Sequence, residues 1–431
     1  MKQTEIGLIP DNWEVKNINK ECTIKARIGW QGLKSNEYLD FGDYVLITGT
    51  DFDNGFINWK SCNYVSEWRF KQDKNIQIKQ GDVLITKDGT IGKVAFLDAI
   101  PMKGTLNSGV FVIRPKSYEK IDTVFLSLIF KSIWFDSFLE QITSGSTIVH
   151  LYQKDFVTFN FPIPPTLTEQ QRIAKALFDV DSLISTTEKL IQKKKNIKQG
   201  AMQNLLTGKK RLPGFGPQTK SPAYKQTELG LIPEDWEVKN IKELGVFISG
   251  SGFPLIEQGR KNEKYPFFKV SDFNNLGNEN KLISASNYVS ETVASKLCCK
   301  IVKKNSIVFA KIGAAIMLER KRITAYDCCI DNNMMAFTVN SDNDFSYLCY
   351  NFQQIPFASL SSSTALPSLS SKIIGNQLIS VPLKEEQTAI ANVLSSMDKE
   401  IETLNTKLVK YRNLKTAMMQ QLLTGKIRLV K

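Results

Sequence analysis

An internal duplication constrains this chain more than any other feature of its sequence. Residues 4–18 read TEIGLIPDNWEVKNI and residues 227–241 read TELGLIPEDWEVKNI, so twelve of fifteen positions are identical. A second match joins MQNLLTGKKRL at 202–212 to MQQLLTGKIRL at 419–429, with nine of eleven positions identical. The offset between the copies is 223 at the first match and 217 at the second. Each copy therefore has a fixed start, a fixed end and a middle of variable length.

The two middles have diverged, although they are still related. The run GDVLITK at 81–87 resembles NSIVFAK at 305–311, and serine-threonine pairs precede the closing segment of each copy at 146–147 and 363–364. Shared ends can serve one structural role, whereas diverged middles can each do something different. The middles are therefore the candidate functional surfaces, and they are predicted to share one fold.

Each middle is predicted to be a mixed α/β domain. Runs of β-branched and aromatic residues bounded by Gly, Asn and Asp predict strands at 44–47, 82–86, 93–97 and 110–113. Asp122 is a predicted N-cap of a helix that runs through Phe125, Ile133 and Phe138. Asp344 has the same role before Tyr347 in the second copy.

Each copy is predicted to close with a long helix. In the first, Thr168 and Gln171 stand at the spacing of a capping box, and Gly208 ends the helix. In the second, the helix follows Pro382 and ends before Gly425. Apolar residues recur every three or four positions, with lapses at Thr187 and Lys194, as in a coiled-coil seam. They are Ile173, Ala176, Val180, Leu183, Leu190, Ile197 and Ala201, then Ile390, Leu394, Met397, Ile401, Leu404, Leu408, Tyr411, Met418 and Leu422.

A helix of about 40 residues is about 60 Å long, which is too long to be buried within one small domain. We expect the two helices to pair, most simply antiparallel and related by a pseudo-two-fold axis. The alternative is that each helix packs only on its own domain. The Pro- and Gly-rich segment from Pro213 to Tyr224 is the predicted linker into the second copy.

Composition indicates a globular protein with a polyanionic partner. The chain has 431 residues, 42% hydrophobic content and a formal charge of +13. Lys and Arg gain by releasing counterions from phosphates, so nucleic acid is the expected partner, although a generally basic surface is the alternative. No apolar run reaches the roughly 18 residues of a membrane span, and no signal peptide is recognised, so we expect a cytoplasmic chain and no membrane role. The seven cysteines lack a C-x-x-C spacing and are expected to be reduced.

The motifs of common catalytic sites are missing from the sequence. His150 is the only histidine, which excludes HExxH metal sites, and a lone histidine is more often a packing or hydrogen-bonding residue. Residues 89–93 (GTIGK) lack the spacing of a phosphate-binding loop, and no Asp/Asn-Pro-Pro-Tyr/Phe motif of an amino-methyltransferase is present. Acidic residues such as Asp51, Asp53, Asp82 and Asp88 leave a hidden Mg²⁺ site open. We therefore predict a non-catalytic chain with no metal site.

Polar and basic residues gather in Gly-rich loops at matching places in both middles. Such residues read base edges or hold phosphates, although any single loop can equally be an ordinary turn. In the first copy the predicted DNA-binding residues are Arg27, Trp30, Gln31, Lys34, Thr48, Thr50, Asp51, Lys87, Asp88, Thr90, Lys93, Asn107, Ser108, Ser146 and Thr147. In the second they are Ser251, Lys269, Ser271, Asp272, Lys311, Asn332, Asn333, Ser363 and Thr364. Lys193, Lys194, Lys195 and Lys198 either line a phosphate channel or form a solvated helix face.

The chain resembles, over essentially its whole length, the specificity (S) subunits of type I restriction-modification systems. The residues that carry the resemblance are Gly7-Leu8-Ile9-Pro10 with Trp13, the PP…EQQRIA start of the first long helix, and the LLTGK endings at 205–209 and 422–426. The runs GTDF at 49–52 and TKDGTIGK at 86–93 also resemble one recurrent class of target-recognition domain. The sequence departs from the pattern at KEEQ (384–387), which leaves open only the cap of the second helix.

The resemblance implies two target-recognition domains joined by two antiparallel helices, each domain reading half of a split, asymmetric double-stranded DNA site. We expect the domains at 1–165 and 227–383, the spacer helices at 166–212 and 384–431, and the linker at 213–226. The implied partners are two methyltransferase subunits, with restriction subunits as an optional addition. S-adenosylmethionine, ATP and Mg²⁺ are expected on those partners and not on this chain. The alternatives are a self-contained DNA-cleaving or modifying enzyme and a coiled-coil scaffold that does not touch DNA.

Overall fold

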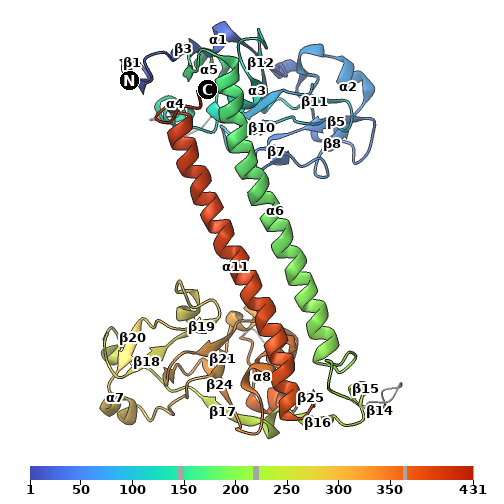
Figure 1. The fold of residues 1–431 in the computed structure, drawn as a ribbon, viewed down its shortest axis with the longest axis vertical. Coiled ribbons are helices and arrows are strands. Elements are labelled where there is room, and N and C mark those ends of the chain that lie inside the picture. Colours follow the sequence, from blue (N-terminus) through green and yellow to red (C-terminus); the bar gives the residue numbers. More distant parts are fainter. Residues whose placement is uncertain (144–149, 217–222, 363–365, 431) are drawn as a thin grey trace. The chain divides into compact units, whose positions relative to one another are not determined.

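The computed structural model describes residues 1–143, 150–216, 223–362 and 366–430. The chain divides into two compact units, of which one comprises Met1–Lys189 with Asn405–Lys431 and the other Leu190–Leu404. Both long helices contribute to both units (Figure 1). The units therefore do not coincide with the two sequence copies. We call them unit 1 and unit 2.

Unit 1 is a mixed α/β structure built on a four-stranded antiparallel sheet in the order β10-β9-β12-β4. A three-stranded sheet in the order β11-β5-β8 contains a parallel pair, β11 with β5. The strands are β1 (Lys2–Thr4), β2 (Gly7–Ile9), β3 (Glu14–Asn17), β4 (Cys22–Ala26), β5 (Tyr44–Ile47), β6 (Phe52–Asp53), β7 (Phe56–Ile57), β8 (Asn63–Val65), β9 (Val83–Thr86), β10 (Val94–Phe96), β11 (Gly104–Leu106), β12 (Val110–Pro115) and β13 (Asn160–Ile163). The helices are α1 (Ile18–Glu21), α2 (Glu67–Lys71), α3 (Thr123–Ile129), α4 (Ile133–Thr143), α5 (Gln153–Phe156) and the first part of α6 (Leu167–Leu205).

Unit 2 repeats this plan with a five-stranded sheet, β17-β24-β21-β22-β19, and a three-stranded sheet, β20-β18-β23. Its strands are β14 (Tyr224–Thr227), β15 (Gly230–Pro233), β16 (Glu237–Asn240), β17 (Gly245–Ser249), β18 (Tyr265–Phe268), β19 (Lys281–Leu282), β20 (Asn287–Val289), β21 (Ser306–Ala310), β22 (Lys321–Thr324), β23 (Cys329–Ile330), β24 (Met334–Val339) and β25 (Leu378–Val381). Its helices are α7 (Glu291–Lys296), α8 (Phe345–Gln354), α9 (Phe357–Leu360), α10 (Ser371–Gly375) and the first part of α11 (Lys384–Leu422). The predicted mixed α/β class is confirmed.

The four predicted strands of the first copy form as β5, β9, β10 and β12, with ends shifted by at most two residues. The predicted N-caps are also confirmed, because Asp122 Oδ1 accepts from the Phe125 amide at 2.8 Å and Asp344 Oδ1 from the Tyr347 amide at 2.9 Å. The single helix predicted through Phe138 was wrong. It breaks after Ile129, whose carbonyl accepts the Ser132 hydroxyl at 2.6 Å, and a new helix begins at Ile133.

The long helices α6 and α11 have 39 residues each. The predicted capping box at Thr168 was wrong, because α6 starts earlier and Thr166 Oγ1 accepts the Glu169 amide at 3.3 Å. The predicted seam was partly wrong, because Leu183, Leu190 and Ile197 are 38–47% exposed, whereas Thr187 and Ile191 are buried. The Thr187 hydroxyl donates to the Leu183 carbonyl at 2.6 Å, and Lys194 forms an ion pair with Glu400 at 2.7 Å.

Within each unit the two helices run antiparallel, as ion pairs between them establish. In unit 1, Asp181 and Glu188 of α6 pair with Lys415 and Arg412 of α11, at 2.6 and 2.7 Å. In unit 2, Lys194 and Lys198 of α6 pair with Glu400 and Asp398 of α11, at 2.7 and 2.6 Å. In both series the residue numbers rise along one helix while they fall along the other. The pairing predicted for the helices is confirmed, and the alternative of separate packing is excluded.

The duplicated segments meet crosswise, so the start of one copy contacts the end of the other. In unit 1, Gly425 (φ +67°) lies so close to Pro10 and Trp13 that an added Cβ would come within 2.3 Å of the proline ring. In unit 2, Gly208 (φ +70°) has the same relation to Pro233 and Trp236, at 2.4 Å. Both glycines are required by the left-handed backbone and by the lack of space for a side chain.

A buried ion pair closes each of these junctions. Arg428 Nη2 lies 2.7 Å from Glu169 Oε2, and Arg211 Nη2 lies 2.6 Å from Glu386 Oε2. Both carboxylates are only 2% exposed. The apolar cores continue across the junctions, because Leu422 and Leu423 belong to the core of unit 1 and Leu205 and Leu206 to that of unit 2.

We expect Arg428→Gln to destabilise unit 1, because it leaves the Glu169 carboxylate buried without its cation. Breaking a buried pair from one side typically costs about 3 kcal/mol. Denaturant unfolding followed by a probe in unit 1 measures the loss. The control is Lys175→Gln, which removes an exposed pair with Asp179 and should change stability by less than about 1 kcal/mol. Equal effects of the two substitutions would contradict the assigned role of the junction.

Burial and, to a smaller degree, the nearby Lys415 charge lower the pKa of Lys131 from its ordinary 10.5 to about 8, against the opposing charge of Asp181. Its ammonium lies 5.9 Å from the centre of the Phe56 ring, and the described residues give it no ion-pair partner. Between pH 8 and 10.5 the unfolded chain therefore holds a proton that the folded chain has released. The free energy of unfolding should therefore rise with pH across this window. Below pH 8 the buried lysine is charged in the folded chain and destabilises it in full.

We therefore expect Lys131→Met to raise the free energy of unfolding of unit 1 at pH 7 by roughly 1–3 kcal/mol. The gain should shrink as the pH rises from 8 toward 10.5. Unfolding measured across this range tests the expectation, with Lys131→Arg as the control that keeps its charge throughout. A gain that did not depend on pH would point to packing instead of charge.

Candidate nucleic-acid interface

The loops predicted to bind DNA occupy equivalent places in the two units. In unit 1 the Lys87 amide donates to the Gly109 carbonyl at 2.9 Å, and the Lys87 carbonyl accepts the Leu151 amide at 2.9 Å. In unit 2 Lys311 makes the same two bonds with Asn333 and Leu369, at 2.8 and 2.9 Å. Each lysine thus follows a central strand, β9 or β21, and is held between two other loops. The same backbone frame carries different side chains in the two units.

In unit 1 this frame brings together three of the predicted loops. The Asn107 amide donates to the carbonyl of Ile47, the last residue of β5, at 2.9 Å. The Cα of Gly49 packs against Thr86, since an added Cβ would lie 3.0 Å from the threonine methyl group. The loop that starts at Thr48, the loop that starts at Lys87 and the turn at Asn107 are therefore neighbours.

Two of the predicted contact residues, Asp51 and Asp272, are buried loop-closing residues. Asp51 is 2% exposed and accepts from the Thr48 amide and hydroxyl, both at 2.8 Å, and from the Ser61 hydroxyl at 3.0 Å. Asp272 is fully buried and accepts from the Lys269 amide at 2.7 Å and the Ser286 hydroxyl at 2.6 Å. Both carboxylates are saturated by the protein, so they shape the loops that carry other side chains.

Arg27 and Gln31 are also buried. The Arg27 guanidinium donates to the Leu106 carbonyl at 2.9 Å, to Thr105 Oγ1 at 3.1 Å and to Gln72 Oε1 at 3.2 Å. Gln31 is 6% exposed. The structure thus presents neither side chain to a ligand. The side chain of Trp30 and residues Ser146, Thr147, Ser363 and Thr364 lie outside the described part of the chain.

The remaining predicted residues are exposed or half-buried. Some are partly engaged, since Lys269 Nζ donates to Gln258 at 3.2 Å and Ser251 Oγ to the Cys298 carbonyl at 3.3 Å. Lys87 Nζ lies 5.3 Å from the centre of the Phe111 ring. The accessible set is Lys34, Thr48, Thr50, Lys87, Asp88, Thr90, Lys93, Asn107 and Ser108 in unit 1, and Ser251, Lys269, Ser271, Lys311, Asn332 and Asn333 in unit 2.

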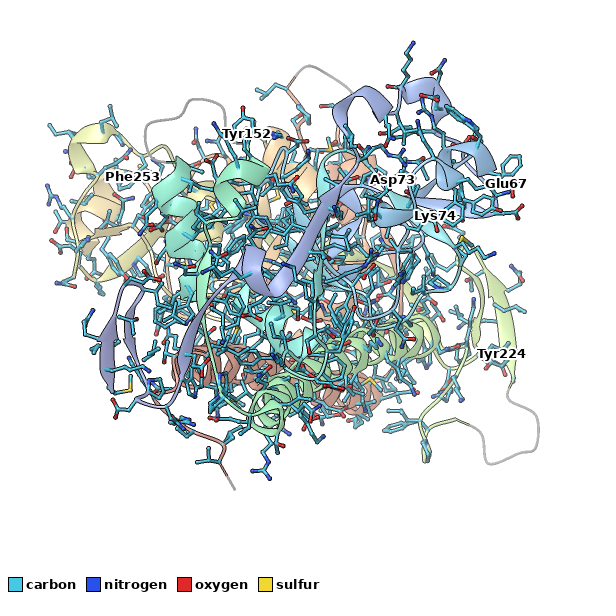
Figure 2. The ribbon with its side chains drawn as sticks, turned by 90° about the horizontal axis from the view of Figure 1, so that it is seen from above. Glu67, Asp73, Lys74, Tyr152, Tyr224 and Phe253 are labelled. Atoms are coloured by element: carbon cyan, nitrogen blue, oxygen red, sulfur yellow. The ribbon has the colours of Figure 1, made fainter. Side chains whose placement is uncertain are left out.

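Several residues beside these loops were not predicted from the sequence. Tyr38 Oη is hydrogen-bonded to the Asn107 amide group, and His150 contacts the Asp88 carboxylate through Nδ1. Tyr152, which is 53% exposed, lies at the start of α5 and is labelled in Figure 2. Lys154 Nζ lies 5.5 Å from the centre of the Tyr152 ring. No local motif marks these residues, because long-range bonds bring them to the loops. Tyr38 is held by its bond with Asn107, and the segment of His150, Tyr152 and Lys154 by the bond of Leu151 to Lys87.

The lysine cluster on α6 is partly neutralised by α11. Lys194 and Lys198 form ion pairs with Glu400 and Asp398, and the Tyr350 hydroxyl also donates to Asp398 at 2.8 Å. Lys193 and Lys195 are exposed. The paired lysines stabilise the helix pair, which favours the solvated helix face over a phosphate channel for this cluster.

The scattered carboxylates do not assemble into a metal site in the described part of the chain. Asp82 forms a bidentate ion pair with Arg114, at 2.6 and 2.7 Å. The Asp51 carboxylate is engaged by Thr48 and Ser61. Among the described residues, no group of three or more His, Cys, Asp or Glu side chains could hold a metal ion. No described helix has the length and apolarity that a bilayer crossing requires.

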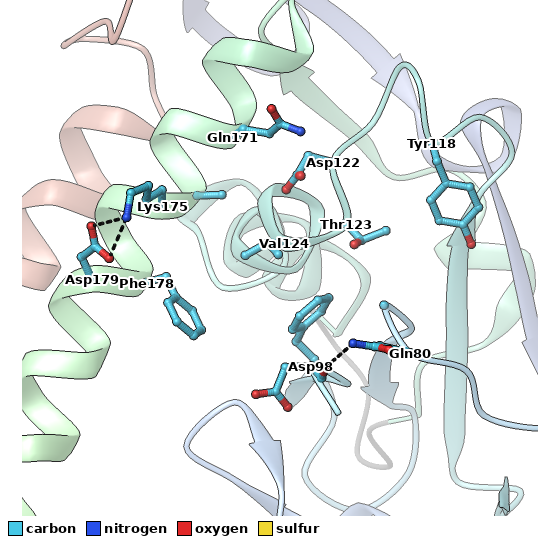
Figure 3. Close-up of a pocket in the computed structure, with 13 residues that line it drawn as sticks. Gln80, Asp98, Tyr118, Asp122, Thr123, Val124, Gln171, Lys175, Phe178 and Asp179 are labelled. Carbon is cyan, nitrogen blue, oxygen red and sulfur yellow. Dashed lines mark hydrogen bonds and ion pairs between the residues drawn. The ribbon is translucent and has the colours of Figure 1, made fainter. Parts of the chain in front are cut away.

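A groove of about 780 Å³ opens on another part of unit 1, between the sheet, α3 and α6 (Figure 3). Its lining includes Phe96, Val124, Ala174 and Phe178, the last 45% exposed. The Gln80 side chain donates to the Asp98 carbonyl at 2.8 Å, and Lys175 pairs with Asp179 at 3.2 Å. None of the predicted DNA-binding residues lines this groove.

Comparison with known proteins places the whole chain in one family. The family model described as "Type I restriction modification DNA specificity domain" matches residues 10–198 and 233–410. The type I restriction enzyme MjaVIII specificity subunit of Methanocaldococcus jannaschii is 29% identical, with 98% of each chain covered. A putative type I restriction enzyme MjaX specificity subunit from the same organism is 25% identical, with 99% of this chain and 96% of that protein covered.

Solved structures share the fold. The S subunit of a type I restriction-modification system from M. genitalium superposes with a TM-score of 0.56 at 15% identity, with 98% of each chain covered. A chain from a study of complex assembly in the type I restriction-modification system gives a TM-score of 0.53 at 16% identity, with 97% of this chain and 100% of that chain covered. Since the family model matches both copies and most of the chain, this protein belongs to the type I restriction-modification specificity family, as the DNA specificity subunit, itself non-catalytic.

Proposed function

We propose that the two diverged middles are target-recognition domains, at 1–165 and 227–383, and that each reads one half of a split, asymmetric DNA site. The observation that carries this proposal is the shared backbone frame around Lys87 and Lys311, which holds different side chains in the two units. A common frame would present each domain to DNA in the same way, and the different side chains would select different bases.

Within each domain we divide the accessible residues by chemistry. Lysines suit phosphates, and amide and hydroxyl groups suit base edges. We assign phosphate contacts to Lys34, Lys87, Lys93, Lys269 and Lys311, and base contacts to Thr48, Thr50, Thr90, Asn107, Ser108, Ser251, Ser271, Asn332 and Asn333. Asp88 stays in the proposed interface as a residue that orients a neighbouring side chain. Trp30, Ser146, Thr147, Ser363 and Thr364 stay in the proposed interface, whereas Arg27, Gln31, Asp51 and Asp272 support its loops.

We further propose that α6 and α11, within the segments 166–212 and 384–431, form the spacer and the docking surface for two methyltransferase subunits. Exposed apolar side chains support this, because an antiparallel pair that was complete in itself would place polar groups outward. Phe178, Leu183, Leu190 and Ile197 on α6 and Val409 and Leu414 on α11 are 38–56% exposed. The proposed assembly acts in the cytoplasm, with S-adenosylmethionine, ATP and Mg²⁺ on the partners and restriction subunits as an optional addition.

The test is retention of DNA by the purified chain in complex with its methyltransferase, measured at rising salt. Phosphate contacts predict that affinity falls steeply with salt concentration. Turnover of DNA by the chain alone, with Mg²⁺, S-adenosylmethionine and ATP supplied, would favour a self-contained enzyme instead. Absence of DNA retention at any salt concentration would favour a scaffold without a DNA role.

Exchange of residues 20–160 for the same segment of another family member should change one half-site and leave the other intact. Each wrong base pair in a specific site typically costs about 1–3 kcal/mol, so the old half-site should no longer be modified. Sequencing of methylated DNA from cells that express the chimera reads both half-sites at once. The reciprocal exchange of the second middle is the control. Alteration of both half-sites by either exchange would contradict the two-domain assignment.

Insertion of one heptad into each of α6 and α11 should lengthen the gap between half-sites without changing their sequences. Seven residues keep the apolar seam in register and add about 10 Å, or about three base pairs. The same methylation assay reports the gap. An insertion of equal length in the linker at 213–226 is the control and should leave the gap unchanged. An unchanged gap after the helix insertions would show that the helices are not the spacer.

A further inference from the structure

The only histidine of the chain lies in the predicted reading surface of unit 1 and is held there by an acidic partner. His150 Nδ1 contacts the carboxylate of Asp88. An ionised carboxylate only accepts hydrogen bonds, so Nδ1 carries a hydrogen and donates it. The orientation of the imidazole is thereby fixed, and none of the described residues occupies Nε2.

Both members of this pair are anchored by the surrounding backbone. Leu151, which follows His150, is fully buried and donates its amide to the Lys87 carbonyl at 2.9 Å. Asp88 lies against Gly109, where an added Cβ would come within 3.4 Å of its carboxylate oxygen. The pair is nevertheless accessible, since the side chains of His150 and Asp88 are 26% and 45% exposed.

The residues around the His150–Asp88 pair are basic and aromatic, which suits a surface that binds an anionic ligand with aromatic groups. The Tyr152 ring lies 4.3 Å from the imidazole, centre to centre, and Lys154 lies over the Tyr152 ring. Lys87 precedes Asp88 and stands at the end of the central strand β9. Lysines and an exposed tyrosine beside a fixed polar group fit the phosphates and bases of a nucleic acid.

The second unit provides an internal comparison. Ile312 follows Lys311 as Asp88 follows Lys87, and Ser368 precedes Leu369 as His150 precedes Leu151. Ile312 and Ser368 form an isolated antiparallel β-bridge, so the two positions are neighbours in unit 2 as well. The backbone arrangement is therefore repeated, whereas the side chains change from a polar dyad to an isoleucine and a serine. This is the pattern expected where two domains share a frame and contact different bases.

We propose that His150, oriented by Asp88, is a base-reading residue of the first target-recognition domain and makes its contact through Nε2. The proposal rests on the function proposed above. A neutral imidazole accepts at Nε2 from the amino group of adenine or cytosine, and a protonated one donates to guanine O6 or N7. Asp88 acts as a positioning residue, because it fixes the ring and touches no base itself.

The test uses the complex of the full chain with its methyltransferase and duplexes in which each base pair of the two half-sites is changed in turn. Dissociation constants are measured for the wild type, His150→Ala, Asp88→Ala and Asp88→Asn. We expect His150→Ala to weaken binding of the cognate duplex roughly tenfold. The variant should also lose discrimination at one base pair of the first half-site. Substitution of that base pair should weaken DNA binding by the wild type and not by the variant.

The Asp88 variants separate positioning from packing. Asp88→Ala should relax discrimination at the same base pair as His150→Ala, whereas Asp88→Asn keeps an acceptor for Nδ1 and should retain most of it. The matched control, Ser368→Ala in the second domain, should leave the profile of the first half-site unchanged. Thermal unfolding of every variant checks that the fold is intact.

A uniform loss of affinity for all duplexes after His150→Ala would overturn the proposal, since it would indicate a phosphate contact or a damaged loop. An unchanged profile would overturn it as well. Failure of the proposed function has a different signature, because the wild-type complex would then prefer no duplex over any other.

Discussion

The crossed junction between the two copies is the contact on which the rest of the structure depends. In unit 1, Pro10 and Trp13 from the start of the first copy receive Gly425 and Arg428 from the end of the second. Unit 2 forms the equivalent contact with the roles of the copies exchanged, between Pro233 and Trp236 of the second copy and Gly208 and Arg211 of the first. Because each junction needs both copies, the duplicated segments are constrained together. This explains why the ends of the copies match so closely while their middles differ.

The junctions also fix the position of the first turn of each long helix, and hence the boundary between that helix and its domain. Glu169 and Gln170 stand in the first turn of α6, where Gln170 accepts the Asp122 amide at 2.9 Å and Glu169 pairs with Arg428. Gln387 and Glu386 do the same in α11 with Asp344 and Arg211. A single helical turn thus connects the junction, the pair of long helices and the helix that follows the proposed reading loops. Hydrogen bonds and ion pairs therefore hold the frame at the places where the proposed reading loops attach.

Much of this arrangement could be predicted from sequence because it is repeated or periodic. The duplication, the strand patterns, the caps at Asp122 and Asp344 and the antiparallel helices all rest on local or recurring signals. The errors came from competing local bonds, such as the Ser132 hydroxyl that ends α3. Residue types alone could not separate Asp51, which is buried and saturated, from Asp88, which is exposed. Residue types also could not predict that His150 lies beside the Lys87 loop. That position depends on the hydrogen bond between the Leu151 amide and the Lys87 carbonyl, which are far apart in the chain.

The division of the chain into units has a consequence for the order of folding. Unit 2 is one continuous segment, Leu190–Leu404, whereas unit 1 needs residues from both ends of the sequence, and Arg428 bonds to Asn12 across 416 positions. Domains generally fold as units while the ribosome extends the chain from the N-terminus. Unit 2 can therefore be complete while the first 189 residues still lack their closing segment. During this interval Trp13 and Glu169 lack their contacts with Gly425 and Arg428. Unit 1 is therefore synthesised first and completed last.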